Sequence, residues 1–258
     1  MEIRSHWFLA ASLFLPALAT AQPRVVHVYV ALADNHHQGI VPVPAKLGNG
    51  DDPARNLYWG ATYGVKRFFS SSPDWQTVNA QDPAKDSVLE RCIFKYRNAE
   101  VFMVADAYQG SRIRDAVADF LDAAGGGQPQ EITLEQPSNL VLHAGGASSL
   151  VAYIGHDGLM DFQAVLPARH RDHDPPWSIV LACASKMFFG PYLREEKARP
   201  LLWTTGLMAP EAYTLKAALD GWIAKETPEQ IRSRAARAYD YYQKCGLKAA
   251  MALLAIGE

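Results

Sequence analysis

Two stretches decide the predicted fold: residues 150–158 read LVAYIGHDG, and residues 178–185 read SIVLACAS. Each begins as a short apolar run with the length and composition of a buried strand. The first run is followed by His156 and the second by Cys183. Because the carboxyl ends of parallel strands meet at one edge of a sheet, two neighbouring strands of this kind would bring the histidine and the cysteine together.

Comparable apolar runs recur along the chain and alternate with segments of helical periodicity. The predicted strands cover residues 24–34, 99–108, 149–158, 177–185 and 199–207. The predicted helices cover residues 56–72, 110–127, 209–226 and 227–246, the last beginning with a Thr227 cap and Pro228. Alternation of this kind is typical of an α/β fold with a mostly parallel sheet and helices on both faces. We therefore expect a three-layer αβα sandwich.

The N-terminal 21 residues have the pattern of a secretory signal peptide. A polar start with Arg4 precedes an apolar run over 7–18, and Ala19 and Ala21 occupy the small-residue positions of a cleavage site. The apolar run is too short to span a bilayer. We expect residues 1–21 to be removed on export to a periplasm or the cell exterior. Residues 22–258 would then form a single α/β domain with no membrane span.

Composition narrows the class of partner. The chain has 258 residues, a formal net charge of -2 and no stripe of basic residues, so we do not expect it to bind nucleic acid. Three cysteines in an oxidising compartment leave a free thiol or an intermolecular bridge. If Cys92 and Cys245 paired, Cys183 would be the free thiol. The sequence gives no oligomeric state.

Cys183 and His156 have the residue types of a nucleophile and its base. A thiol becomes a good nucleophile near neutral pH when a histidine takes its proton. Backbone N–H groups near Gly158 and at Cys183 would then form an oxyanion hole, and Asp157 could orient His156. The alternative is that Cys183 is a small core residue and His156 a structural histidine.

The order of these motifs resembles that of the caspase-like cysteine peptidases, which include caspases, legumain-type peptidases, clostripain and gingipains. In this family a hydrophobic strand ends in His-Gly and a second ends in Ala-Cys; the matching stretches here are LVAYIGHDG and IVLAC. The helix over 110–124 precedes the histidine strand, as in the family. The resemblance implies a caspase-like fold and a cysteine-type endopeptidase that acts on peptide or protein substrates without a cofactor. Asp157 stands where the family has its glycine.

Polar residues at the other strand ends are candidates for the substrate cleft. The resemblance implies that Thr204 and Thr205 lie on an edge strand that aligns the substrate backbone. The remaining candidates follow or end the first two strong strands, and they are Asp34, His36, His37 and Asp106. Asp34 and Asp106 could bind a basic side chain or a metal.

Two other functions fit parts of the sequence. The His and Asp residues of DNHH (34–37) and RDHD (171–174) are ligand types of metal-dependent hydrolases, although no H-x-x-x-H spacing is present. The chain could also be a non-catalytic exported binding protein on the same fold. Alkylation separates the three, because only a cysteine peptidase would lose activity when Cys183 is modified.

Overall fold

The computed structural model of the chain describes residues 22–78, 85–136, 140–166 and 173–257. The expected signal peptide, residues 1–21, lies outside the described residues, as do residues 171 and 172 of the RDHD motif. Within the described part, none of the helices combines the length and the hydropathy that crossing a membrane would require.

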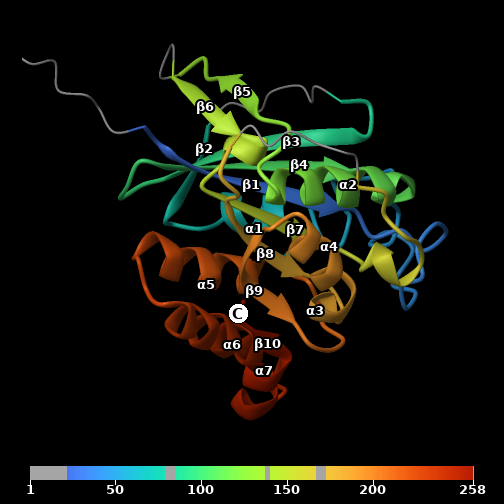
Figure 1. The fold of residues 1–258 in the computed structure, drawn as a ribbon. Coiled ribbons are helices and arrows are strands. Elements are labelled where there is room, and N and C mark those ends of the chain that lie inside the picture. Colours follow the sequence, from blue (N-terminus) through green and yellow to red (C-terminus); the bar gives the residue numbers. More distant parts are fainter. Residues whose placement is uncertain (1–21, 79–84, 137–139, 167–172, 258) are drawn as a thin grey trace, which may run out of the picture.

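An eight-stranded sheet forms the middle layer, in the order β10-β9-β8-β7-β1-β4-β3-β2 (Figure 1). The five strands from β9 to β4 are parallel, and β10, β3 and β2 are added antiparallel at the two sides. The strands are β1 (Arg24–Ala31), β2 (Trp75–Val78), β3 (Val88–Tyr96), β4 (Val101–Tyr108), β7 (Leu150–Ile154), β8 (Trp177–Leu181), β9 (Arg199–Thr204) and β10 (Leu254–Ala255). The predicted α/β class and mostly parallel sheet are confirmed.

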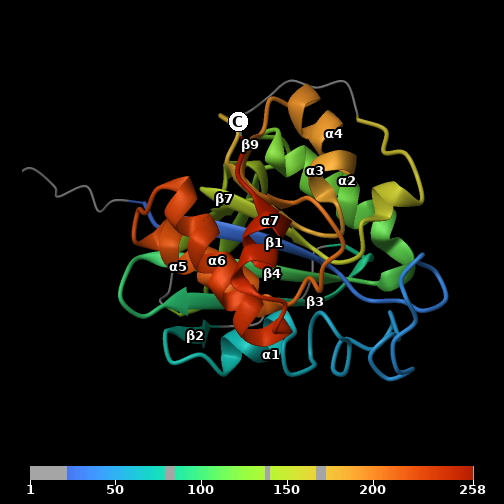
Figure 2. The ribbon, with the colours of Figure 1, turned by 90° about the horizontal axis from the view of Figure 1, so that it is seen from below.

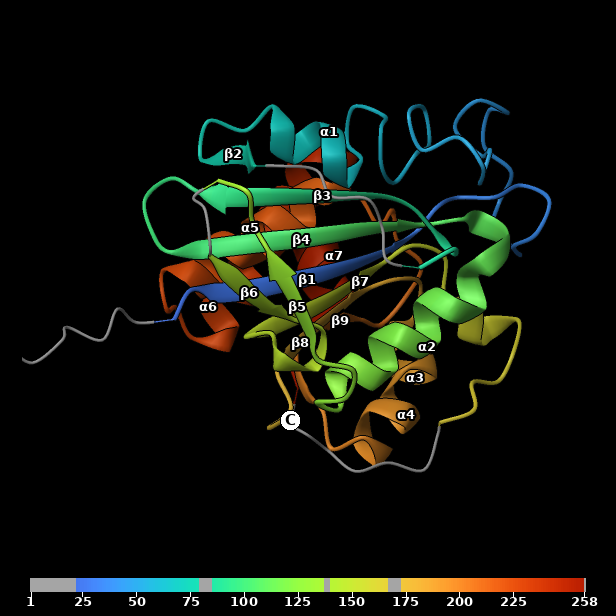
Figure 3. The ribbon, with the colours of Figure 1, turned by 90° about the horizontal axis from the view of Figure 1, so that it is seen from above.

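Helices cover both faces of this sheet. One face carries α1 (Val65–Ser70), α5 (Ala212–Ile223), α6 (Pro228–Gln243) and α7 (Leu247–Leu253), and Figure 2 shows α5 to α7 lying across it. The other face carries α2 (Ile113–Ala124), α3 (Ser185–Phe188), α4 (Gly190–Glu195) and the hairpin β5 (Gln130–Thr133)–β6 (Val141–Ala144), as seen in Figure 3.

The central strand β1 shows why this arrangement fits the sequence. Val26, Val28 and Val30 pack with α1, α5 and α6, whereas Tyr29 and Ala31 pack with α2. A strand covered on both faces has no side that needs polar residues. This explains the nearly continuous apolar sequence of β1, and of β7 and β8 beside it.

Several short elements differ from the sequence prediction. Only Val65–Ser70 of the predicted helix over 56–72 is helical, and α5 begins at Ala212. The hairpin β5–β6, α7 and β10 were not predicted, because such short segments contain too few periods to give a pattern. By contrast, the Thr227 cap of α6 is confirmed as a full capping box with Gln230.

The three cysteines are all free. Cys92 is buried on β3, Cys183 is half-buried after β8, and Cys245 is exposed between α6 and α7. The pairing of Cys92 with Cys245 considered from the sequence is therefore not formed.

Candidate functional site

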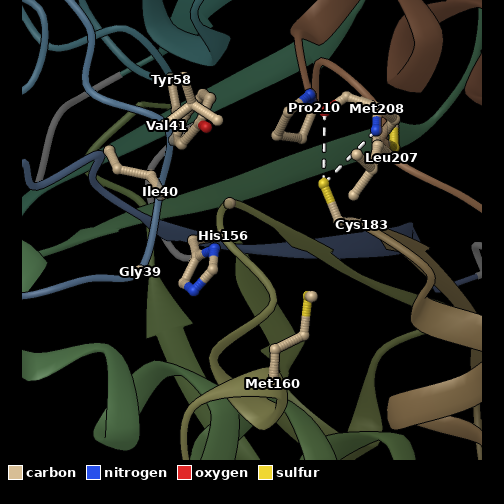
Figure 4. A pocket seen from close by; sticks show the side chains of 11 residues that line it. Gly39, Ile40, Val41, Tyr58, His156, Met160, Cys183, Leu207, Met208 and Pro210 are labelled. Carbon is tan, nitrogen blue, oxygen red and sulfur yellow. Dashed lines mark hydrogen bonds between the residues drawn. The ribbon is translucent and has the colours of Figure 1, made fainter.

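The carboxyl ends of β7 and β8 bring His156 and Cys183 to one cavity. The two strands are parallel neighbours, and Ile154 pairs with Leu181 at the last position of the ladder. Each reactive residue follows its strand by two positions, so the two side chains leave the sheet at the same level. Both line a cavity of about 230 Å³ (Figure 4).

A glycine makes the turn from β7 to His156 feasible. Gly155 has a φ of +150°, a conformation that L side chains rarely adopt. A Cβ at this position would also lie 2.8 Å from the carbonyl oxygen of Ala31, at the end of β1. The backbone therefore passes close to the neighbouring strand and directs His156 into the cavity.

Asp161 fixes the orientation of the His156 ring. Nε2 of His156 lies 2.6 Å from Oδ2 of Asp161, which also accepts a hydrogen bond from the N–H of Gly39. A carboxylate accepts a hydrogen, so Nε2 carries the proton and Nδ1 holds the lone pair. Within the described residues Nδ1 has no hydrogen-bond partner. Figure 4 shows one ring nitrogen facing the side of the cavity on which Cys183 lies.

Cys183 occupies a tight turn between β8 and α3. The next residue, Ala184, has a left-handed conformation with a φ of +48°, which costs a non-glycine residue about 1 kcal/mol or more. The N–H of Ala184 donates to the carbonyl of Gly206. The Cys183 sulfur receives the N–H of Met208 at 3.4 Å and lies 3.6 Å from the Met208 carbonyl oxygen (Figure 4). The β9–α5 connection thus holds the thiol at the cavity wall.

Thr204 stabilises this turn from inside the protein. Its hydroxyl donates to the carbonyl of Ala182 and accepts the N–H of Ser185, while its own N–H donates to the Ser185 hydroxyl. Thr204 is fully buried. The expectation that it contacts substrate is corrected, because none of its side chain reaches the cavity.

The expected role of Thr205 is corrected for a different reason. The edge of β9 is already occupied by β10, with Thr204 opposite Leu254 and Trp203 opposite Ala255. The Thr205 N–H and hydroxyl donate to the carbonyls of Leu253 and Ala252. The chain's own C-terminal segment therefore takes the hydrogen bonds that were assigned to a substrate backbone.

The loop after β1 reaches the cavity through residues other than those predicted. Asp34 is buried and accepts hydrogen bonds from the N–H groups of His36 and His37 and from the His37 ring. Its carboxylate therefore shapes the loop, and His36 and His37 are exposed. The residues of this loop that line the cavity are Gly39, Ile40 and Val41.

Asp106 belongs to a separate buried network and not to the His156–Cys183 cavity. Arg91 binds both of its oxygens, at 2.6 and 2.7 Å, and Nε2 of His27 lies 3.0 Å from one of them. Burial alone would raise the pKa of Asp106, but these hydrogen bonds and the charge of Arg91 outweigh it and hold the pKa at about 2. The predicted cleft role of Asp106 is corrected.

Asp157 and Gly158 also have a structural role. The Asp157 carboxylate accepts the N–H of Leu159 and caps the short helix η3 (Gly158–Met160) instead of binding His156. Burial raises the pKa of Asp157 to about 7. Gly158 is not among the residues that line the cavity. The oxyanion contact expected from the N–H groups near Gly158 stays a prediction.

The chain was compared with known proteins on three levels. No protein-family model, curated protein or solved structure matches it. Its function is therefore inferred from its own residues. In the part of the chain that the structure describes, no group of three or more His, Cys, Asp or Glu side chains is placed to hold a metal ion.

The sequence reasoning missed two polar residues of the site. Asp161 lies five positions after His156, but the adjacent Asp157 was the more obvious candidate for orienting the ring. Tyr58 lines the cavity from the loop before α1. Burial, followed by the nearby Cys183 and Glu211, raises the pKa of Tyr58 well above its usual range, so its hydroxyl stays protonated. No local sequence pattern indicates that Tyr58 reaches Cys183.

Proposed function

We propose that this protein is an exported cysteine-type peptidase in which Cys183 is the nucleophile and His156 is its base. One observation carries the proposal: the thiol and the imidazole follow adjacent parallel strands and line the same cavity. The hydrogen bond from His156 to Asp161 adds support, because it leaves the unprotonated nitrogen for the thiol. The resemblance of the two strand motifs to caspase-like peptidases agrees with this assignment.

The reaction has two chemical steps. Nδ1 of His156 takes the thiol proton, and the sulfur of Cys183 attacks the carbonyl carbon of the substrate. The C–N bond breaks as the imidazolium gives its proton to the leaving amine, and a thioester remains on Cys183. A water molecule then attacks the thioester with His156 as base, which releases the carboxylic acid and restores the thiol. Asp161 stabilises the imidazolium that forms in each step.

The backbone N–H of Cys183 is the donor we assign to the developing oxyanion. This N–H makes no backbone hydrogen bond within the described residues, whereas the next N–H, at Ala184, is occupied by Gly206. A donor that is free before the reaction and fixed by a tight turn is well suited to stabilise charge in the transition state.

The proposal is tested by alkylation and substitution. Iodoacetamide should abolish hydrolysis of a mixed peptide library, with the label on Cys183, and C183A should be inactive while remaining folded. Exposed Cys245 provides the control, because C245A should retain full activity. Retained hydrolysis in C183A would exclude the mechanism. Loss of activity to a chelator, with no response to iodoacetamide, would favour metal-dependent hydrolysis instead.

A further inference from the structure

The wall of the His156–Cys183 cavity defines a class of substrate. We infer that it receives an apolar side chain, so that the enzyme cleaves after residues such as Leu, Met or Phe. This inference rests on the proposed function. The side chain nearest to an attacked carbonyl belongs to the residue that supplies that carbonyl. A cavity that contains the sulfur is therefore where this side chain is received.

The lining of the cavity is predominantly apolar and comes from five separate segments of the chain. Besides the reactive pair and two glycines, the lining residues are Ile40, Val41, Tyr58, Met160, Leu207, Met208 and Pro210. None of the described lining residues is Asp, Glu, Lys or Arg. Figure 4 shows the hydrophobic side chains distributed around the space between His156 and Cys183.

The exposure of this lining supports a binding role. Val41 is 84% exposed, Leu207 77% and Met160 44%, although all three are large hydrophobic residues. They come from segments far apart in the sequence and gather around one cavity. Exposed apolar side chains that cluster in this way, rather than being scattered singly, mark a binding surface.

The size and polarity of the cavity also favour an apolar substrate side chain. Its volume of about 230 Å³ exceeds the roughly 150 Å³ of a dry apolar cavity that binds benzene, so a leucine or phenylalanine side chain fits. A carboxylate or guanidinium group entering it would lose its hydration without finding an opposite charge on the wall. Charged substrate side chains should therefore bind weakly in the cavity, whereas apolar ones gain binding free energy when they leave water.

The test uses the purified protein and a series of fluorogenic peptides that differ only in the residue before the scissile bond. With Leu, Met or Phe there, kcat/KM should exceed that with Asp, Arg or Asn by about 10²-fold, a ratio within reach of a pocket of this type. Leu207→Glu adds a carboxylate to the wall at a well-exposed position. It should lower kcat/KM for the Leu peptide and raise it for the Arg peptide.

A matched control separates the local change from a general effect of added charge. Val165 is also exposed, at 87%, and does not line the cavity, so Val165→Glu should leave the selectivity unchanged. Cleavage by the unmodified protein that favours Asp or Arg would overturn the inference and leave the proposed function standing. Failure to cleave any peptide of the series, together with no Cys183-dependent hydrolysis of the mixed library, would overturn both.

Discussion

Two histidines on neighbouring strands, each bound to an aspartate, have different surroundings. His27 on β1 is fully buried: Nε2 lies 3.0 Å from Asp106, and Nδ1 lies 3.0 Å from the Gly145 N–H and 3.1 Å from the Tyr29 hydroxyl. Both of its nitrogens are occupied. His156, after β7, uses one nitrogen for Asp161 and presents the other to a cavity with a thiol. A His–Asp pair indicates chemistry only when one nitrogen remains available beside a reactive group.

The aspartates beside these two histidines, Asp106 next to His27 and Asp157 next to His156, also differ in how completely they are paired. Arg91 and His27 outweigh burial at Asp106 and hold its pKa at about 2, so this carboxylate is charged and fully paired. Asp157, adjacent to His156, has no cation among its partners within the described residues, and burial raises its pKa to about 7. One Oδ atom of Asp157 is buried without a hydrogen bond in that part of the chain. The Asp106 carboxylate near His27 therefore has all of its oxygens hydrogen-bonded, whereas the Asp157 carboxylate near His156 does not.

The largest expected effect is the loss of kcat when the unprotonated nitrogen of His156 is removed. His156→Gln removes the proposed base and should lower kcat by about 10⁴-fold. Steady-state hydrolysis of a Leu peptide measures the loss, and thermal unfolding should show a retained fold. His143→Gln is the control, because His143 is half-buried on β6 and is not among the residues that line the cavity. Equal activity in the two variants would contradict the assignment of His156.

The buried network should respond in stability instead of activity. Arg91→Met leaves the Asp106 carboxylate buried without its main cation and should lower the free energy of unfolding by about 3–5 kcal/mol. Urea unfolding measures this change. Lys95→Met, on the same strand, breaks an exposed pair with Glu100 and should cost less than about 1 kcal/mol. If the folded R91M protein lost catalysis, the two regions would not be independent.

The third effect concerns the orientation of the His156 ring. Asp161→Asn removes the carboxylate that, in the proposed mechanism, selects the reactive tautomer of His156 and stabilises its imidazolium. Because Asp161 is 42% exposed, water replaces part of its effect, and we expect kcat to fall by about 10²-fold. Asp115→Asn, on α2, alters a surface pair with Arg112 and should leave kcat unchanged. Full activity of D161N would show that His156 does not need this partner.

The fourth effect is a pH dependence of stability at Asp157. Its pKa rises from an ordinary value of about 4 to about 7 on folding, so the folded protein binds a proton that the unfolded chain releases. The stability linked to this proton is present below pH 4 and is lost as the pH rises through 7. Asp157→Asn abolishes this loss, so its Tm relative to the unmodified protein should rise between pH 4.5 and pH 8.

A second substitution checks that the pH dependence of Tm originates at the Asp157 carboxyl group. Asp157→Ser keeps an oxygen that can cap the N–H of Leu159 but has no carboxyl group, and it should show the same rise in relative Tm. A difference in Tm that does not change with pH in either variant would mean that Asp157 is not the titrating group.

The sequence predicted the parallel core of the fold and the location of the two reactive residues. Apolar runs of five to eight residues, as in β1, β7 and β8, can be recognised because strands covered on both faces need no polar side. The Thr227 capping box could be recognised for an equally local reason. Short segments such as β10 carry no such signal, so their occupation of the β9 edge was not foreseen.

The contacts of individual polar residues depended on the tertiary structure. Thr204 ends β9, Asp106 lies near the end of β4 and Asp34 follows β1, as cleft residues would. Each is nevertheless bound by a residue of the protein itself: Asp106 by Arg91, Thr204 by Ser185 and Asp34 by His37. Those partners lie up to 19 positions away in the sequence, and no local pattern specifies which pair will form.

The sequence by itself determined that His156 and Cys183 follow buried strands, because strand periodicity is a local property of the chain. Only the tertiary structure decided that these strands are neighbours in register and that Asp161 takes one nitrogen of His156. Only the tertiary structure, too, gathers Val41, Met160 and Leu207 around the thiol. These features depend on packing between distant segments, which is governed by the burial of the whole core.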